Sequence, residues 1–184
     1  PDALAPTYSR AQISPDFKAN GSVDPAAADY KALKADGFAG YRLVIDGLVE
    51  RPLSLSLAEL RTRPAQSQIT KHDCVEGLSS IAEWTGVRLE TLLDEAGLKP
   101  QARYLVFHCA DRMGTGEMYY ESIDLIDARH PQTILAWDMN GETLPVPHGA
   151  PLRLRVERQL GYKQAKYIKR IEAVESFARL GGGK

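Results

Sequence analysis

The feature that most constrains this fold is a series of short apolar runs, each alternating or rich in β-branched residues and each ending near a turn signal. Such runs are typical of β-strands, whose side chains alternate between two faces. The first run, YRLVIDGLVERPLSLSL (41–57), contains the turn signal Asp46-Gly47 and predicts a strand pair. Further strands are predicted for the runs QITKHDCV, RYLVFHCA, TILAWDM, PLRLRVE and YIKRIEAVE. Asn140-Gly141 predicts a hairpin turn.

Helices are expected to be few and short. Ser56 and Glu59 fit the S-x-x-E capping box, which predicts a short helix that ends at about Thr62. The run RLETLLDEAG predicts an amphipathic helix with Gly97 as its C-terminal cap, and Ser122 is expected to cap a short helix near IDLIDA. Many strands with few helices favour an α+β, β-rich mixed fold over a doubly wound sheet.

Length and composition favour one principal domain. The chain has 184 residues, of which 43% are hydrophobic, and this is enough for one well-formed core. We expect residues 1–40 to form an irregular arm that packs on a domain of residues 41–176, with 177–184 as a flexible tail. A net charge of −1 argues against nucleic acid as a partner, and no apolar run is long enough for an integral membrane segment.

The two cysteines differ in their surroundings. Cys74 lies in the stretch KHDCVEG, where an expected strand ends among charged residues, whereas Cys109 follows the apolar run RYLVF. Lys71 and His72 would favour the thiolate of Cys74, which is the reactive and metal-binding form. Free cysteines are among the most buried residues, so a packing role for Cys74, or a disulfide between the two cysteines, stays open at this point.

Three segments, in order along the chain, carry a resemblance to a known family. They are the run 41–93 with its motif HDCVEG, the segment MNGETLPVPHGAPLRLRV, and GYKQAKYIKRIEAV. Together they resemble the molybdopterin-binding domain of the sulfite oxidase superfamily over roughly residues 13–176, most closely the small bacterial members that consist of this domain alone. The resemblance implies the α+β fold of that domain, with molybdenum and molybdopterin as cofactors.

The resemblance also implies a set of site residues. Cys74 would ligate molybdenum and would therefore be catalytic, which suits a soft thiolate and a thiophilic metal. His148 and Arg153 would contact the pterin and its phosphate. The segment GYKQAK would hold the phosphate through Lys163, Gln164, Ala165 and Lys166. A phosphate requires convergent cations and free backbone N–H groups, whereas each Lys or Arg taken alone would be a solvated surface charge.

Four further residues have two interpretations each. Asn20, in FKANGSVDP, resembles a pterin contact in the arm of relatives or is a turn residue. Cys109 occupies the place of a small polar residue that lies over the cofactor in relatives, or packs in the core. Tyr119 resembles a catalytic tyrosine that faces the metal centre in sulfite-oxidising relatives, or is a buried structural tyrosine. His72 either tunes the metal-binding cysteine or faces solvent from its strand.

The chain departs from the family pattern next to the metal-binding motif. Leu78 stands where the family commonly carries a tryptophan, which changes the wall of the substrate cavity. The arginine cluster that binds sulfite in relatives has no clear match, although Arg112 and Arg155 are available. The resemblance therefore implies a molybdenum–molybdopterin oxidoreductase without fixing sulfite as its substrate.

The activity implied by the resemblance is oxygen-atom transfer on a small sulfur oxyanion or sulfoxide. Electrons would be exchanged with an external haem- or quinone-linked partner, because the chain has no redox motif of its own. Two alternatives are a cofactor-binding module or subunit without independent turnover, and a β-rich binding domain without cofactor in which the cysteines pack or pair. Relatives of this kind are exported, which implies the periplasm, although this sequence contains no signal peptide.

Overall fold

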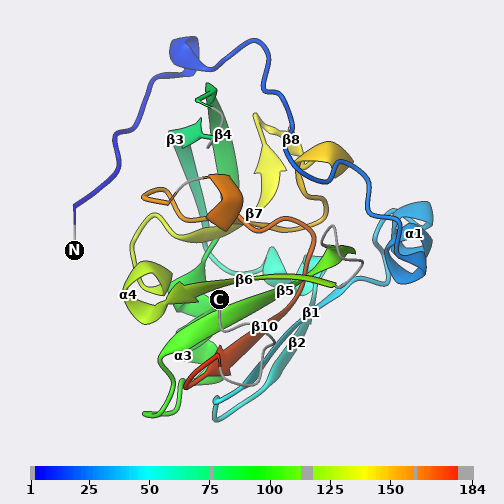
Figure 1. The fold of residues 1–184 in the computed structure, drawn as a ribbon, viewed down its shortest axis with the longest axis vertical. Helices are drawn as coiled ribbons and strands as arrows, with labels where there is room; N and C mark the ends of the chain where they lie inside the picture. Colours follow the sequence, from blue (N-terminus) through cyan, green and yellow to red (C-terminus); the bar gives the residue numbers. More distant parts are fainter. Residues whose placement is uncertain (1–2, 75–76, 113–117, 160, 178–184) are drawn as a thin grey trace.

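The structure, a computed structural model, describes residues 3–74, 77–112, 118–159 and 161–177 and contains two β-sheets (Figure 1). The first sheet has the order β2-β1-β10-β5-β6, with β1 (Arg42–Gly47), β2 (Leu53–Ser56), β5 (Tyr104–Arg112), β6 (Met118–Asp124) and β10 (Ile168–Val174). The second has the order β3-β4-β7-β8, with β9 paired to β7; its strands are β3 (Ala65–Asp73), β4 (Ser79–Arg88), β7 (Ile134–Met139), β8 (Glu142–Thr143) and β9 (Arg153–Arg155). β1 and β10 are parallel, and the other pairs are antiparallel.

Short helices connect these strands. The α-helices are α1 (Ala28–Ala35), α2 (Leu57–Leu60), α3 (Leu89–Ala96) and α4 (Leu125–Ala128), and the 3-10 helices are η1 (Arg10–Gln12), η2 (Val146–His148) and η3 (Gly161–Lys163). The predicted capping box is confirmed, because Ser56 Oγ accepts from the Glu59 N–H at 3.1 Å and Glu59 Oε1 accepts from the Ser56 N–H at 3.3 Å. α3 ends at Gly97, whose φ of 73° lies in the region that favours glycine.

Several elements differ from the sequence-based expectations. The prediction that Ser122 caps α4 is wrong, because β6 continues through Ser122 and the cap is Asp124, whose Oδ1 accepts from the Asp127 N–H at 2.8 Å. The strands β4 and β6 were not expected, and neither was α1, which lies within the arm. The expected strand pair 41–57 and the hairpin turn at Asn140-Gly141 are confirmed. The turn signal Asp46-Gly47 does not form the turn of that pair, because both residues lie within β1 and pair with Glu172 and Ala173 of β10.

The main core cluster contains apolar side chains from both sheets. Leu43, Phe107 and Ile171 come from the first sheet, and Val87 and Leu135 come from the second; each is 0% exposed. Burial of this apolar surface is the principal driving force for bringing the two sheets together. The fold is therefore a β-rich α+β fold, as predicted.

The N-terminal arm runs along the second sheet before it reaches α1 (Figure 1). The Tyr8 N–H donates to the Ile69 C=O at 3.0 Å, and the Ser14 N–H donates to the Ile81 C=O at 2.9 Å. The division of the chain at residue 40 stays a prediction, and residues 178–184 of the predicted tail lie outside the described residues. In the described part of the chain, no helix combines the length and apolar character that crossing a membrane requires.

Candidate functional site

Cys74 lies directly after β3, at the start of a short turn. Its N–H donates to the Leu78 C=O at 2.9 Å, and its C=O accepts from the Gly77 N–H at 3.0 Å. The thiols of Cys74 and Cys109 are both free, with Cys74 half-buried and Cys109 buried. The alternative in which the two cysteines form a disulfide is therefore wrong. A thiol presented at a strand end can bind a metal as its thiolate.

Two buried arginines on β9 form the second part of the site. Arg153 and Arg155 are 3% and 0% exposed, and their guanidinium carbons lie 4.7 and 4.6 Å from the centre of the Trp84 ring. These distances are typical of cation–π contacts. Arg155 also forms a two-point ion pair with Glu157, with 2.8 Å between Nε and Oε1 and 3.1 Å between Nη2 and Oε2. Arg155 was considered as a sulfite ligand, but it is fully buried and engaged within the fold.

Lys166 and His148 lie with Arg153 in the same region. Arg153 Nη1 donates to the His148 C=O at 2.9 Å. A side-chain Cβ at Gly149 would lie 2.9 Å from the Lys166 Cβ and 3.1 Å from the Arg153 Cβ, so the glycine permits the close approach of the two cations. Lys166 Nζ donates to three backbone carbonyls, those of Asn20, Ser22 and Pro147. Sequence-predicted His148, Arg153 and Lys166 are thus brought together.

We call Arg153, Arg155 and Lys166 the cation cluster, and its electrostatics favour an anion. Burial, and then the Arg155 charge, lowers the pKa of Arg153 to about 9. Burial, and then the Arg153 charge, lowers the pKa of Lys166 to about 8, and the same two causes, with Lys166 added, lower the pKa of His148 to about 4. Each group is harder to protonate than in water, because it is buried and lies near other positive charges. A bound anion would offset the repulsion between these positive charges.

His72 links the cation cluster to the end of β3. Its Nδ1 lies 2.6 Å from Arg155 Nη1, and the side chain is buried, so the interpretation of His72 as a solvent-facing residue is wrong. Burial, followed by the charges of Arg155 and Arg153, lowers the pKa of His72 to about 2, so the ring is neutral at physiological pH. A Cβ at Gly161 would lie 2.8 Å from His72 Nε2, which places η3 against this ring.

The other residues of the segment GYKQAK make contacts within the fold. Lys163 Nζ lies 2.8 Å from Glu121 Oε1. The Gln164 side chain accepts from the Val156 N–H at 2.7 Å and donates to the Val156 C=O at 2.6 Å, and the Ala165 N–H donates to the Lys163 C=O at 3.1 Å. These contacts fix the shape of the segment that carries Lys166. Phosphate binding by Lys163, Gln164 and Ala165 stays a prediction.

Cys109, Tyr119 and Asn20 have less direct relations to the site. Cys109 is 1% exposed in the main core, and burial raises the pKa of its thiol. Tyr119 donates its O–H to Glu121 Oε2 at 3.0 Å, and burial, with the Glu121 charge, raises its pKa, so the hydroxyl stays protonated. Asn20 approaches the cation cluster through its backbone C=O, which accepts from Lys166 Nζ at 2.7 Å. Their roles at the cofactor remain predictions.

The donor set fits a molybdenum–pterin group. Within the described residues, no group of three or more His, Cys, Asp and Glu side chains could hold a metal ion, so a metal at Cys74 needs ligands from a cofactor. In the same part of the chain, Arg153 Nε and Trp84 Nε1 are buried N–H groups without a hydrogen-bond partner. An anionic cofactor would supply both the acceptors and the negative charge that these groups lack.

Sequence reasoning missed several residues that shape this region. Phe17 of the arm packs against the rings of His72, Trp84 and His148 at centroid distances of 5.4, 5.7 and 5.2 Å. Glu157 was not singled out, although it is the partner of Arg155. An acidic residue two positions after an expected strand arginine is the signal that could have indicated this pair, whereas no local pattern indicates the contacts of Phe17.

Comparisons with known proteins agree with this geometry. A family model described as the oxidoreductase molybdopterin binding domain matches residues 30–179. The chain is 38% identical over 96% of its length to a protein-methionine-sulfoxide reductase subunit, YedZ1, of Azospira oryzae, and 37% identical over 73% of its length to the catalytic subunit MsrP of Gluconobacter oxydans. It spans 63% and 47% of these two relatives, respectively.

A solved structure with the same fold is the sulfane dehydrogenase SoxCD from Paracoccus pantotrophus. It superimposes with a TM-score of 0.68 at 28% sequence identity, covering 74% of this chain and 39% of the SoxCD chain. The resemblance to the sulfite oxidase superfamily and the predicted fold class are both confirmed. Because the family model covers most of the chain, this protein belongs to the oxidoreductase molybdopterin-binding domain family.

Proposed function

We propose that this chain is the catalytic domain of a molybdenum–molybdopterin oxidoreductase that reduces a sulfoxide. The observation that carries the proposal is the cation cluster, of which Arg155 lies within hydrogen-bond reach of His72, two residues before Cys74. A thiol ligand for a soft metal and a buried excess of positive charge for a phosphate are the two features that such a cofactor needs.

Each of these residues has a distinct part in holding the cofactor. Cys74 would ligate the molybdenum through its thiolate. Arg153 and Lys166 would neutralise the phosphate, with His148 beside them as a neutral partner. When bound, the molybdenum centre supplies two-electron redox chemistry with transfer of an oxygen atom. The protein fixes the ligand geometry and excludes water through the buried rings of the region.

Tyr119 is the residue that we propose to orient the substrate. Its hydroxyl is protonated, and Glu121, which also pairs with Lys163, holds it in place. The hydroxyl has one proton, which it donates to Glu121 in this structure, so it would bind the oxygen of a sulfoxide by exchanging Glu121 for the substrate as its acceptor. Since such a donor acts without changing its own charge, it would orient the substrate without requiring a group to titrate.

The names of the relatives favour a sulfoxide over a sulfur oxyanion as substrate. Two of them are named as protein-methionine-sulfoxide reductase components. Reduction of a sulfoxide consumes two electrons and two protons and releases a sulfide and water. The electrons would come from an external haem- or quinone-linked partner. We also propose a periplasmic location, which osmotic-shock fractionation of the native host would test.

One observation favours the alternative of a subunit without independent turnover. The chain spans 63% of the relative from Azospira oryzae, and that relative is itself named as a subunit. In this alternative the chain holds the cofactor, but turnover requires a further part that delivers electrons. An artificial dye reductant separates the two cases, because it replaces the electron donor and not the site.

The test begins with the cofactor and then addresses turnover. Molybdenum by elemental analysis, and pterin by the fluorescence of its oxidised form, are measured on wild type and Cys74→Ser made in a host that synthesises the cofactor. We expect both in wild type, loss of molybdenum in Cys74→Ser, and retention in the control Ile126→Ser, which changes an exposed residue of α4. Reduced dye should then be oxidised by methionine sulfoxide and not by sulfate. Wild type without molybdenum and pterin contradicts the proposal.

A further inference from the structure

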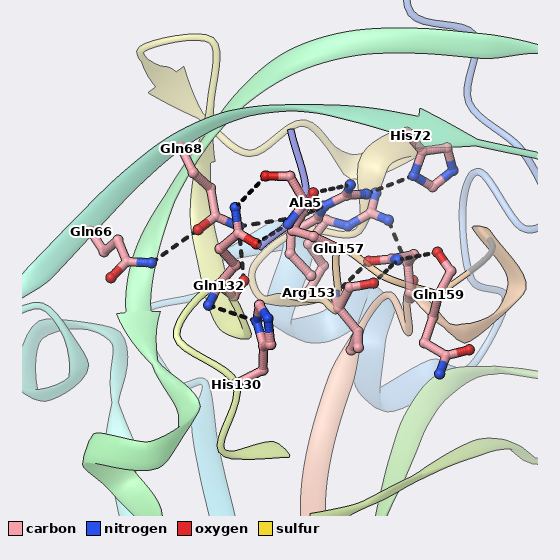
Figure 2. A network of polar contacts seen from close by, with 12 residues as sticks. Ala5, Gln66, Gln68, His72, His130, Gln132, Arg153, Glu157 and Gln159 are labelled. Atoms are coloured by element: carbon pink, nitrogen blue, oxygen red, sulfur yellow. Dashed lines mark hydrogen bonds and ion pairs between the residues drawn. The ribbon is translucent and has the colours of Figure 1, made fainter. Parts of the chain in front are cut away.

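The ring of His72 is held in one orientation by a chain of buried polar contacts. Arg155 Nη1 lies 2.6 Å from His72 Nδ1, and Glu157 fixes the other edge of the same guanidinium. Glu157 Oε1 also accepts from Gln68 Nε2 at 3.2 Å, and Gln68 Nε2 donates to the Gln132 C=O at 2.9 Å (Figure 2). The chain continues to the arm, because the Gln132 side chain exchanges hydrogen bonds with the backbone of Ala5.

This arrangement determines where the proton of His72 resides. A guanidinium has N–H donors and no acceptor, so His72 Nδ1 must accept the hydrogen bond from Arg155 with its lone pair. A neutral imidazole carries its one proton on the other nitrogen, which is Nε2. Neither nitrogen then has a free lone pair, so His72 is unable to ligate a metal despite its closeness to Cys74 in the sequence.

The Nε2–H group lies against Gly161, where only a glycine leaves it unobstructed. A Cβ at Gly161 would lie 2.8 Å from His72 Nε2 and 3.2 Å from the Asp73 C=O. Any other residue at this position would therefore press on the N–H group. The same ring contacts Phe17, which in turn packs on His148, so the donor lies among the residues proposed to hold the cofactor.

We infer that His72 is a fixed hydrogen-bond donor to an anionic acceptor of the bound cofactor, with Arg155 and Glu157 as its positioning residues. The inference rests on the proposed function, since the acceptor belongs to the cofactor. Its physical basis is that an N–H donor held by buried neighbours needs no reorganisation when the ligand binds. Arg155 and Glu157 act through His72 and do not themselves touch the ligand.

Two variants separate donation from a purely structural role. His72→Asn keeps an acceptor near the position of Nδ1, where Arg155 needs it, but has no atom at the position of Nε2. His72→Gln places an amide N–H donor near the position of Nε2 but has no polar atom at the position of Nδ1. If His72 donates to the cofactor, the His72→Asn protein loses the cofactor and the His72→Gln protein retains the cofactor. If His72 only satisfies Arg155, the order is reversed.

The readout is the molybdenum and pterin content that remains after dialysis. We expect His72→Asn to retain about tenfold less than wild type, the effect typical of losing a partner of a metal-site ligand, and His72→Gln to stay within about threefold. The control His108→Asn changes a histidine of β5 that pairs with Glu172 at 3.0 Å, and it should retain the wild-type content. Thermal unfolding of each cofactor-free variant identifies any that fails to fold.

A second measurement tests the donor without the cofactor. In nitrogen-15 NMR of the histidine rings of the cofactor-free protein at neutral pH, His72 should appear as the tautomer with the proton on Nε2. The opposite tautomer overturns the inference, and so does a fully loaded His72→Asn protein. A wild type that never binds molybdenum or pterin is a different result: it refutes the proposed function, while the tautomer still decides whether the donor exists.

Discussion

Replacement of Glu157 by glutamine should destabilise the protein more than any exposed charge change. The side chains of Glu157 and Arg155 are both 0% exposed, and two contacts of 2.8 and 3.1 Å join them. Two unit charges about 4 Å apart attract with roughly 4 kcal/mol at an effective dielectric constant of about 20. Glutamine keeps one acceptor but leaves a buried guanidinium without its counter-charge, so we expect a loss of about 3 kcal/mol or more.

Urea unfolding of the cofactor-free protein at neutral pH measures this loss. The control is Asp24→Asn, which removes an exposed ion pair with Lys34 at 2.8 Å and should cost at most about 0.5 kcal/mol. In the double variant Glu157→Gln with Arg155→Met, the loss should be about 2 kcal/mol smaller than the sum of the single losses. A Glu157→Gln cost below about 1 kcal/mol, or strict additivity in the double variant, refutes this account of a coupled buried pair.

Three further predictions concern the cation cluster. Gly149→Ala should cost about 2 kcal/mol in thermal unfolding and reduce molybdenum content, because its φ is 115° and the new Cβ would press on Lys166 and Arg153; an unchanged melting temperature contradicts this. Arg153→Lys should lose pterin as fully as Arg153→Gln, since charge without the planar fork and Nε does not replace a guanidinium; retention in Arg153→Lys alone contradicts it. The third prediction uses pH: the pKa of Lys166 is lowered from 10.5 to about 8, so its charged form costs stability below pH 8, and this cost disappears as the pH rises toward 10.5. Inorganic phosphate should therefore raise the melting temperature of the cofactor-free protein more at about pH 7 than at about pH 9.5, and equal shifts would count against the cluster as an anion site.

The parts of the fold that sequence reasoning predicted are those with local causes. Gly97 at the end of α3 and Asn140-Gly141 between β7 and β8 supply positive φ values of 73°, 54° and 78°, and these requirements are visible in the sequence. β4 was missed because its determinant is not local. Gly86 interrupts its apolar pattern, and only the structure shows why: a Cβ there would lie 1.8 Å from the Leu135 C=O of β7.

For the candidate site too, some features were predicted from the sequence and others were not. The ligand types, from Cys74 to Lys166, were predicted through resemblance, and the structure brings His148, Arg153 and Lys166 together. What the sequence did not predict is how these residues are held. Arg155 was expected to be available to a substrate, yet its contacts with Glu157 and Trp84 hold it in the interior. The sequence did not predict the contact with Trp84, because it joins β9 to β4 and depends on how the sheet is assembled.

The contacts of Lys166 and Arg153 imply different tasks for the two cations. An ammonium has three donors, and Lys166 directs its Nζ to three carbonyls, two of them in the arm at Asn20 and Ser22. It can therefore offer a phosphate its charge, while a new hydrogen bond would require Nζ to release one of these three carbonyls. Arg153 still has a buried N–H without a partner at Nε, so it can offer a hydrogen bond at once. The lysine thus connects the arm to the site and contributes charge, whereas the arginine contributes a directed hydrogen bond to the ligand.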